Sequence, residues 1–155
     1  MRMKKKQPQV KRIRNARARF DYELGDDLLV GIVLNGRETK ALRLGHGQLR
    51  GAFVSVKDGE LWLNNMTVTG RNGLPIDDSE QTRARKLLAK RREIAALMSA
   101  KHEGKTIVPT EVLTQKRFIK VRIAVGKGKK QYDKRQSLKK KDDARSAQRD
   151  LKGRY

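Results

Sequence analysis

Hydrophobic and polar positions in the middle of this chain alternate mostly with the two-residue period of β-strands. Residues 28–34 form a short apolar run of branched side chains that ends at Asn35-Gly36, a pair suited to a tight turn or a helix start. Residues 118–125 alternate strictly, with Ile119, Val121, Ile123 and Val125 on one face and Phe118, Lys120, Arg122 and Ala124 on the other. We predict a buried strand in the first segment, and a strand with one core face and one basic face in the second.

A hairpin is predicted in the first half of the chain. Residues 52–56 and 61–66 read as strands and flank Lys57-Asp58-Gly59-Glu60, where Asp-Gly favours a hairpin turn because both residues tolerate positive φ. Four aromatic residues fall within strand patterns and are expected in the core: Phe20, Phe53, Trp62 and Phe118. Several short strands of this kind predict an antiparallel barrel or sandwich, in which closing the sheet removes exposed edges.

Two helices are predicted to interrupt the strands. Residues 83–100 have the spacing of an amphipathic helix that lies on the barrel and stops at Gly104. Its apolar stripe would contain Leu87, Leu88, Ile94, Ala95, Leu97 and Met98. A shorter helix is predicted over residues 37–43. Residues 69–81, with glycines, Pro75 and acids, predict an irregular surface loop.

The positive charge of the chain is concentrated at its two ends. The 155 residues include 39 Lys and Arg against 17 Asp and Glu, which gives a formal net charge of +22. Residues 1–19 carry nine basic and no acidic side chains, and residues 126–155 carry twelve against four. A polyanion that binds such a surface releases condensed counterions, so nucleic acid is the expected partner and an anionic membrane surface the alternative. Charged ends can also be merely solvated, but basic segments on both sides of a nearly balanced body favour nucleic-acid-binding arms.

Candidate residues for catalysis or metal binding are few. The histidines are His46 and His102, and the chain has no cysteine, so thiolate sites and disulfides are excluded. The acid pairs at 26–27 and 77–78 fall in turns, where capping and solvation outweigh acid–base catalysis. Residues 126–130 resemble a phosphate loop but lack its spacer and its final Lys-Ser or Lys-Thr. We predict a chain that is not an enzyme and needs no cofactor and no metal.

The chain also lacks membrane signals. No segment approaches the ~18 apolar residues of a spanning helix, and the polar start has no signal-peptide core. We therefore expect a soluble protein in the cytoplasm. Tyr22 and Tyr132 differ from the other aromatic residues because each lies beside basic residues at the edge of the predicted body. Such rings can stack on unpaired bases of single-stranded RNA.

Five motifs occur in a fixed order between Asn15 and Arg135. They are Asn15-Ala16-Arg17-Ala18-Arg19-Phe20-Asp21-Tyr22, residues 31–43 (GIVLNGRETKALR), residues 58–63 (DGELWL), residues 82–88 (TRARKLL) and residues 128–135 (GKKQYDKR). In order and spacing they resemble the small protein B family, the SsrA-binding proteins that partner transfer-messenger RNA. The resemblance implies an oligonucleotide-binding-type antiparallel β-barrel with flanking helices. It also implies a role in rescuing stalled ribosomes by trans-translation.

The same resemblance implies the partners. In that family the body grips the tRNA-like domain of transfer-messenger RNA, in place of the anticodon arm that this RNA lacks. The tail enters the empty mRNA channel of the 30S ribosomal subunit and meets 16S rRNA at the decoding centre. Elongation factor Tu is an indirect partner, through the aminoacylated RNA. A monomer without membrane contacts is expected.

The resemblance further implies two sets of site residues. The family's RNA-contacting asparagine, glutamate and helix leucine correspond to Asn15, Glu38 and Leu87 or Leu88. The surface for transfer-messenger RNA is expected to contain Asn15, Arg19, Tyr22, Glu38, Lys40, Lys86, Leu87 and Leu88. The contacts with the decoding centre and mRNA channel are expected from Gly128, Lys129, Lys130, Tyr132, Asp133, Lys134, Arg135, Lys139, Lys140 and Lys141. Tyr132 stands where the family commonly has a histidine, a change that preserves stacking. Glu38 is expected either to accept a hydrogen bond from a base or to order a neighbouring Arg or Lys.

We divide the chain into a basic N-terminal arm at 1–14, a body at 15–127 and a basic tail at 128–155. The tail is expected to open with a flexible cationic hinge and to contain a latent helix from about Ser137. Its low apolar content predicts disorder in free solution, whereas a phosphate-lined channel would neutralise its lysines and favour a helix. Two alternatives compete with this function: an intrinsic ribosomal or general RNA-binding protein with basic arms, and a phosphodiesterase on the same scaffold, which the missing metal-ligand cluster disfavours.

Overall fold

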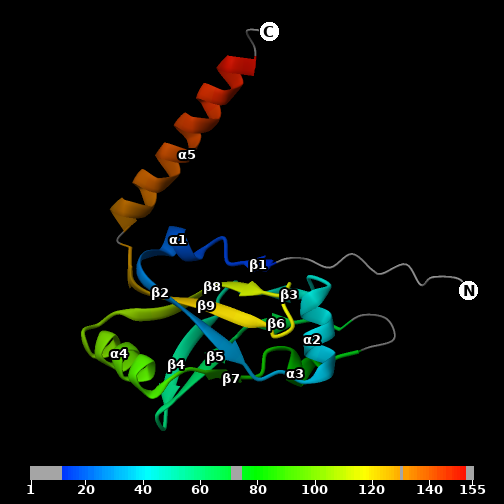
Figure 1. The fold of residues 1–155 in the computed structure, drawn as a ribbon. Coiled ribbons are helices and arrows are strands. Elements are labelled where there is room, and N and C mark those ends of the chain that lie inside the picture. The colour runs from blue at the N-terminus through cyan, green and yellow to red at the C-terminus, as the bar shows by residue number, and fades with distance from the viewer. Residues whose placement is uncertain (1–11, 71–74, 130, 153–155) are drawn as a thin grey trace, which may run out of the picture.

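The protein folds as a closed antiparallel β-barrel that carries a projecting C-terminal helix (Figure 1). The computed structural model describes residues 12–70, 75–129 and 131–152, and of residues 131–133 and 150–152 it describes the backbone. The barrel strands are β1 (Arg12–Arg14), β2 (Tyr22–Ile32), β4 (Phe53–Lys57), β5 (Glu60–Asn64), β7 (Arg85–Leu88), β8 (Thr106–Leu113) and β9 (Lys120–Gly128). They follow the order β1-β8-β4-β5-β7-β2-β9, and β8 also pairs with β9, which closes the sheet. The predicted antiparallel barrel is confirmed.

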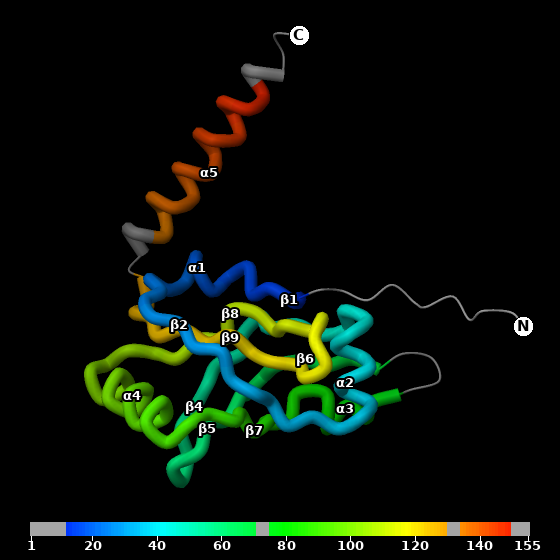
Figure 2. Tube along the Cα trace, viewed as in Figure 1, coloured from blue at the N-terminus to red at the C-terminus, as the bar shows by residue number. Residues whose placement is uncertain are grey.

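Apolar side chains from every wall of the barrel meet in one core. Leu61, Leu63, Ile107, Val121 and Ile123 are completely buried and come from β5, β8 and β9. Helices cover the two ends of the barrel, with α2 (Gly36–Arg43) and the short α3 (Asp78–Gln81) at one end and α4 (Arg91–His102) at the other (Figure 2). The remaining elements are α1 (Ala18–Asp21), which lies beside β1, and the small sheet of β3 (Gly47–Gln48) and β6 (Thr67–Val68).

Local signals in the sequence placed several elements correctly. The predicted hairpin is formed by β4 and β5, and its turn residues Asp58 and Gly59 have φ of 52° and 74°, as an Asp-Gly turn requires. Helix α2 matches the helix predicted over 37–43. Strand β9 shows the predicted alternation, except that Ala124 on the predicted outer face is only 3% exposed. Ala124 lies opposite Asp27 and Val108, where both neighbouring strands carry register shifts, which accounts for its burial.

The helix predicted over residues 83–100 is wrong in its first half. Residues Arg85–Leu88 form β7, which pairs with β5 on one side and β2 on the other. Their burial has period two, with Arg85 and Leu87 facing inward, because the barrel needs a strand at this position to close. The helix α4 begins only at Arg91. Of its predicted stripe Leu97 is buried and Ile94 half-buried, whereas Ala95 and Met98 are exposed.

The expectation of four core aromatic residues is also wrong in part. Phe53 is 43% exposed and Phe118 is 69% exposed, while Phe20 and Trp62 are half-buried. Residues 69–81, predicted as an irregular loop, include the helix α3 and the buried Ile76. Strand β8 was not predicted. Its Pro109 sits at a register shift against β9, where a residue without a backbone N–H is tolerated.

The segment between α2 and β4 contains several glycines, and the structure gives a reason for one of them. Gly47 of β3 packs against the helix: a Cβ at this position would lie 2.4 Å from Cδ2 of Leu42 and 3.1 Å from Cδ1 of Ile13. The first of these contacts is shorter than real Cβ contacts, so a side chain at this position would displace Leu42, which is buried in the core. Glycine at position 47 therefore lets β3 approach α2 without that displacement.

The tail forms the helix α5 (Gln131–Lys152) and points away from the barrel (Figure 1). It begins at Gln131, earlier than the predicted start near Ser137, and only Lys129 and Lys130 lie between it and β9 in the sequence. The side chains from Lys139 to Arg149 are all exposed, and Leu138 is 50% exposed. The described helix therefore gains little from packing on the body, as the low apolar content of this segment indicates.

Candidate nucleic-acid interface

A groove with basic and aromatic side chains lies between α1, β4 and the end of α4. Its volume is about 410 Å³, and its lining includes Asn15, Arg17, Tyr22, Phe53 and Lys101. Phe53 offers a partly exposed ring, and Arg17 before α1 and Lys101 of α4 are exposed cations in the same lining. A ring beside cations is a combination that binds an unpaired base together with its phosphate. We call this hollow the Asn15 groove.

The backbone around Asn15 is held firmly to the barrel. The side-chain Nδ2 of Asn15 donates to the carbonyl of Pro109 at 2.9 Å, and its backbone N–H donates to Thr110 at 2.8 Å. These two bonds fix the chain between β1 and α1 against β8. Asn15, expected to contact RNA, therefore also sets the position of α1. Arg19, from the same predicted set, is exposed on that helix.

The start of the tail joins this groove through Asp21. The backbone N–H of Lys129 donates to the Asp21 carbonyl at 2.9 Å, and the ammonium of Lys134 lies 3.4 Å from the Asp21 carboxylate. Lys134 also lies 6.0 Å from the centre of the Phe20 ring. Tyr22, which follows Asp21, pairs with Gly128 in the sheet. The residues expected to bind transfer-messenger RNA at Asn15 and Tyr22 are thus adjacent to the first residues expected at the decoding centre. The sequence contained no signal for the part played by Asp21.

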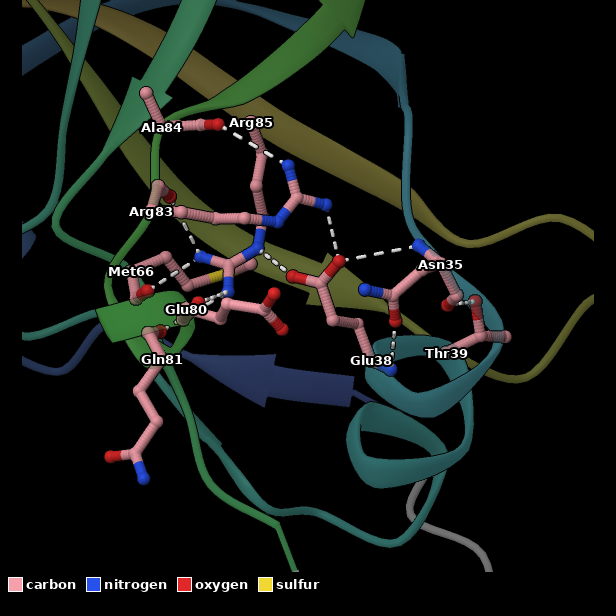
Figure 3. Close-up of polar contacts among 9 residues, drawn as sticks. All are labelled: Asn35, Glu38, Thr39, Met66, Glu80, Gln81, Arg83, Ala84 and Arg85. Carbon is pink, nitrogen blue, oxygen red and sulfur yellow. Dashed lines mark hydrogen bonds and ion pairs between the residues drawn. The ribbon is translucent and has the colours of Figure 1, made fainter. Parts of the chain in front are cut away.

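Glu38 lies at the centre of a second polar cluster, at the α2 end of the barrel (Figure 3). Its carboxylate accepts hydrogen bonds from both Arg83 and Arg85, and from the backbone N–H of Asn35 at 3.2 Å. The Asn35 side chain in turn accepts from the backbone N–H of Glu38 at 2.9 Å, which completes a capping box at the start of α2. Only 1% of Glu38 is exposed.

Arg85 is entirely buried beside Glu38. Besides the carboxylate it donates to the backbone carbonyls of Met66, Glu80, Gln81 and Arg83 at 2.7 to 3.2 Å. These bonds tie β6 and α3 to the start of β7. Burial alone would raise the pKa of Glu38, but the hydrogen bonds from Arg83, Arg85 and the Asn35 backbone lower it below its ordinary value. Glu38 is therefore ionised and paired in the folded protein.

The burial of Glu38 bears on the two roles expected for it. Its carboxylate is 1% exposed and orders Arg83 and Arg85, which corresponds to the second of those roles. Of the three charged side chains that form the ion pairs, Glu38 and Arg85 are buried, whereas Arg83, with its side chain 35% exposed, reaches the surface. Sequence reasoning missed Arg83 because nothing in its neighbourhood marks it as the partner of a residue 45 positions away.

The remaining predicted contacts lie on β7 and α2. Leu87 is 2% exposed and belongs to the core, whereas Leu88 is 52% exposed. Both lie in a strand, so the helix leucine that the resemblance placed here is not on a helix, and the leucine of α4 is Leu97. Lys86 is half-buried and pairs with Glu60 at 2.9 Å, and Lys40 is exposed on α2. The predicted set is therefore divided between the Asn15 groove and the α2 end of the barrel.

Another hollow in the barrel has more acidic than basic residues in its lining. It has a volume of about 710 Å³ and lies between the irregular part of β2 and α4, with an apolar floor of Leu24, Leu97 and Val125. Its lining carries Glu23, Asp26, Asp27 and Glu93 against Lys105 and Lys127. This excess of acidic residues makes the hollow less suited to phosphate than the Asn15 groove. Within the residues that the structure describes, no group of His, Asp and Glu could hold a metal ion.

The predicted tail residues lie partly inside and partly outside the described part of the chain. The side chains of Tyr132 and Asp133, and all of Lys130, lie outside the described residues, as do residues 1–11 of the basic arm. Of the other tail positions, Gly128 and Lys129 end the barrel and Lys134 touches Asp21. Arg135, Lys139, Lys140 and Lys141 are exposed on α5. Residues 12–14, which the sequence assigned to the arm, form β1 on the body.

Comparison with known proteins agrees with the motifs. A family model described as SmpB protein matches residues 12–153. The chain belongs to the SmpB family. An SsrA-binding protein of Synechococcus sp. (strain JA-3-3Ab) is 41% identical over 144 residues, which cover 92% of this chain and 94% of the relative. Another from Paracoccus denitrificans (strain Pd 1222) is 44% identical over 140 residues, 89% of this chain and 90% of the relative.

The fold agrees with a solved member of the same family. A chain described as tmRNA–SmpB in the bacterial ribosome superposes with a TM-score of 0.66 at 31% sequence identity, and covers 83% of this chain and 95% of that chain. The SmpB family resemblance found in the five motifs is thereby confirmed.

Proposed function

We propose that this SmpB-family protein binds transfer-messenger RNA and brings it to stalled bacterial ribosomes. The observation that carries the proposal is the junction at Asp21, where the Asn15 groove and the root of α5 share one carboxylate and one carbonyl. An RNA held in the groove and a tail inserted into the ribosome would then be fixed relative to each other. Its SsrA-binding relatives and the tmRNA–SmpB structure on the ribosome support the same function.

The body and the tail have separate tasks in this proposal. The body at 15–127 recognises the RNA, and the tail at 128–155 probes the empty mRNA channel of the 30S subunit, against 16S rRNA. The exposed cations of α5, Lys139 to Lys141 among them, would contact rRNA phosphates. Elongation factor Tu joins through the aminoacylated RNA. The protein acts as a monomeric, non-enzymatic adaptor in the cytoplasm. None of the described helices is long and apolar enough to cross a membrane.

Binding specificity tests the function directly. At one fixed salt concentration near 0.15 M, the chain is expected to bind the tRNA-like domain of transfer-messenger RNA more tightly than an elongator tRNA, because electrostatic attraction alone would not separate the two. Filter binding with both RNAs measures the ratio. Equal affinities would show a general RNA binder. A ribosomal protein would remain on ribosomes through a high-salt wash that removes a factor.

Lys101 tests the Asn15 groove. If Lys101 contacts an RNA phosphate, Lys101→Ala weakens binding and lowers the slope of log Kd against log salt by about one counterion. Lys57, exposed in the β4–β5 hairpin away from the groove, gives the matched control Lys57→Ala with an unchanged slope. Filter binding at four salt concentrations measures both slopes. Identical slopes for the two variants would place the RNA elsewhere.

A further inference from the structure

The hollow of about 710 Å³ between β2 and α4 has an apolar floor that is open to solvent. We call it the β2–α4 hollow. In its floor Leu24 and Val125 are half-buried and Leu97 is buried. The register of β2 against β9 shifts between Leu24 and Asp27, which makes this wall irregular. Gly126 of β9 keeps the floor accessible, because a Cβ there would lie 3.1 Å from Cδ2 of Leu24.

The charges around this floor are only partly compensated. Its charged lining residues are Glu23, Asp26, Asp27, Glu93, Lys105 and Lys127. Asp27 pairs with Arg122 at 3.3 Å, and Lys105 pairs with Glu103, outside the hollow, at 3.2 Å. In the described part of the chain, the other three carboxylates form no ion pair. An apolar floor beside such carboxylates suits a cationic segment that also carries an apolar side chain.

One face of α5 has this composition. Leu138 is 50% exposed on the helix. Residues three and four positions away share its face, so Leu138 is flanked by Lys134, Arg135 and Lys141, and by the single acid Asp142. Arg135 and Lys141 are exposed. This face offers one apolar side chain among cations, and the hollow offers an apolar floor among acids.

The hollow lies within reach of this face. Figure 1 shows α5 leaving the barrel where β9 ends, and Lys127, near that end, lines the hollow. The chain from Lys127 to the start of α5 spans at most ~14 Å, and the helix from there to Leu138 adds about 10 Å. Lys134 already lies 3.4 Å from Asp21, which is two residues before Glu23 of the hollow.

We propose that the β2–α4 hollow is the docking site of the chain's own tail while the protein is away from the ribosome. Leu138 then lies on the apolar floor, and Arg135 and Lys141 lie beside the carboxylates. The helix turns about Lys129, and Lys134 exchanges Asp21 for a neighbouring acid, which costs little because exposed ion pairs are weak. So small a hollow holds a separate partner weakly, whereas a tethered segment is present at a millimolar effective concentration.

Docking gives the tail a role in the free protein, which goes beyond the proposed function. A docked tail hides cations of α5 from RNAs that are not its target. In the mRNA channel, a dense array of phosphates outcompetes the few carboxylates of the hollow and releases the tail. This release step rests on the proposed function, whereas the docking itself does not.

Crosslinking of the full chain without RNA tests the docking. The chain has no cysteine, so Ala96→Cys in the hollow and Asp142→Cys on the Leu138 face of α5 introduce one defined pair of thiols. We expect a short bismaleimide to join them about fivefold faster, or more, than the control pair of Lys57→Cys with Asp142→Cys. Lys57 is exposed in the β4–β5 hairpin, outside the hollow. Salt at about 1 M should bring the two rates together, because it screens the charges.

Charge reversal tests which residues make the contact. Asp26→Lys with Glu93→Lys should lower the crosslinking rate to that of the control pair, and Arg135→Glu with Lys141→Glu should do the same. All four substitutions together should restore the rate, because the charges are again complementary. Each rate is divided by the rate at which the single cysteines react, which removes effects of charge on the thiols themselves.

The outcomes separate this inference from the proposed function. Asp77→Lys with Asp78→Lys reverses two exposed acids outside the hollow and should leave the rate unchanged. Equal rates for the two cysteine pairs would overturn the docking, as would a rate that reversal in the hollow does not change. Crosslinks between two chains, which increase with concentration, would also overturn it. Because no RNA is present, each of these results leaves the proposed function standing, and thermal melting confirms that every variant is folded.

Discussion

A chain that ends after Lys129 is expected to bind the tRNA-like domain as tightly as the full-length protein and to support no tagging of stalled peptides. The reason is that the barrel ends, and the tail begins, at the contacts with Asp21. Strand β9 continues to Gly128 and pairs there with Tyr22, and Lys129 closes the barrel edge through its bond to Asp21. A truncation at an earlier residue would remove backbone pairs of β9. Its effect could then come from damage to the barrel and not from loss of the tail. A tagging assay on ribosomes stalled without a stop codon measures the effect, beside filter binding.

The tagging assay also distinguishes the contribution of the tail's positive charge from the contribution of its helical structure. Ala144→Pro retains every cation of α5 but breaks the helix in its middle, because proline lacks the N–H and its ring clashes with the preceding turn. Ala144→Ser is the matched control. We expect tagging to be lost with proline and kept with serine. Tagging by the chain that ends after Lys129 would show that the tail is not needed in the mRNA channel.

Elements with a local cause could be predicted from the sequence. The Asp58-Gly59 turn carries its own conformational preference, and the alternation in the first half of β9 reports the buried face of Val121 and Ile123. In each case, the residues that carry the signal lie within a few positions of one another. The five ordered motifs then identified the family, and with it the barrel.

Elements fixed by distant partners could not be predicted in this way. Residues 85–88 have the composition of a helix surface. They form β7 because they pair with β2 on one side and with β5 on the other, which joins these two strands into one sheet. Phe118 fits a core pattern, yet Arg43, 71 to 74 positions from the carbonyls it binds, holds its loop outward. Glu38 is drawn inward by arginines 45 and 47 positions away. In each case the deciding contact is absent from any local window of sequence.

Glu38→Ala is expected to cost about 3 to 5 kcal/mol of folding free energy, because it leaves the completely buried Arg85 without its counter-charge. For a body of this size the melting temperature should fall by on the order of 10 °C. Circular dichroism against temperature measures this fall. Loss of RNA binding would then follow from disorder around Arg83 and β7, and it should be partly recovered by cooling.

Controls on the same helix and at acid pH test this structural role. Lys40→Ala removes an exposed side chain two residues away and should leave the melting temperature unchanged. Because the pKa of folded Glu38 lies below its ordinary value of 4.5, its contribution is full above pH 4.5 and is lost as pH falls through the folded pKa. The stability gap between the wild type and Glu38→Gln should therefore narrow below pH 4.5. Glu38→Ala could instead melt at the same temperature as Lys40→Ala and still bind RNA poorly. That result would show that the carboxylate acts on RNA itself and that RNA binding does not depend on the stability of the buried cluster.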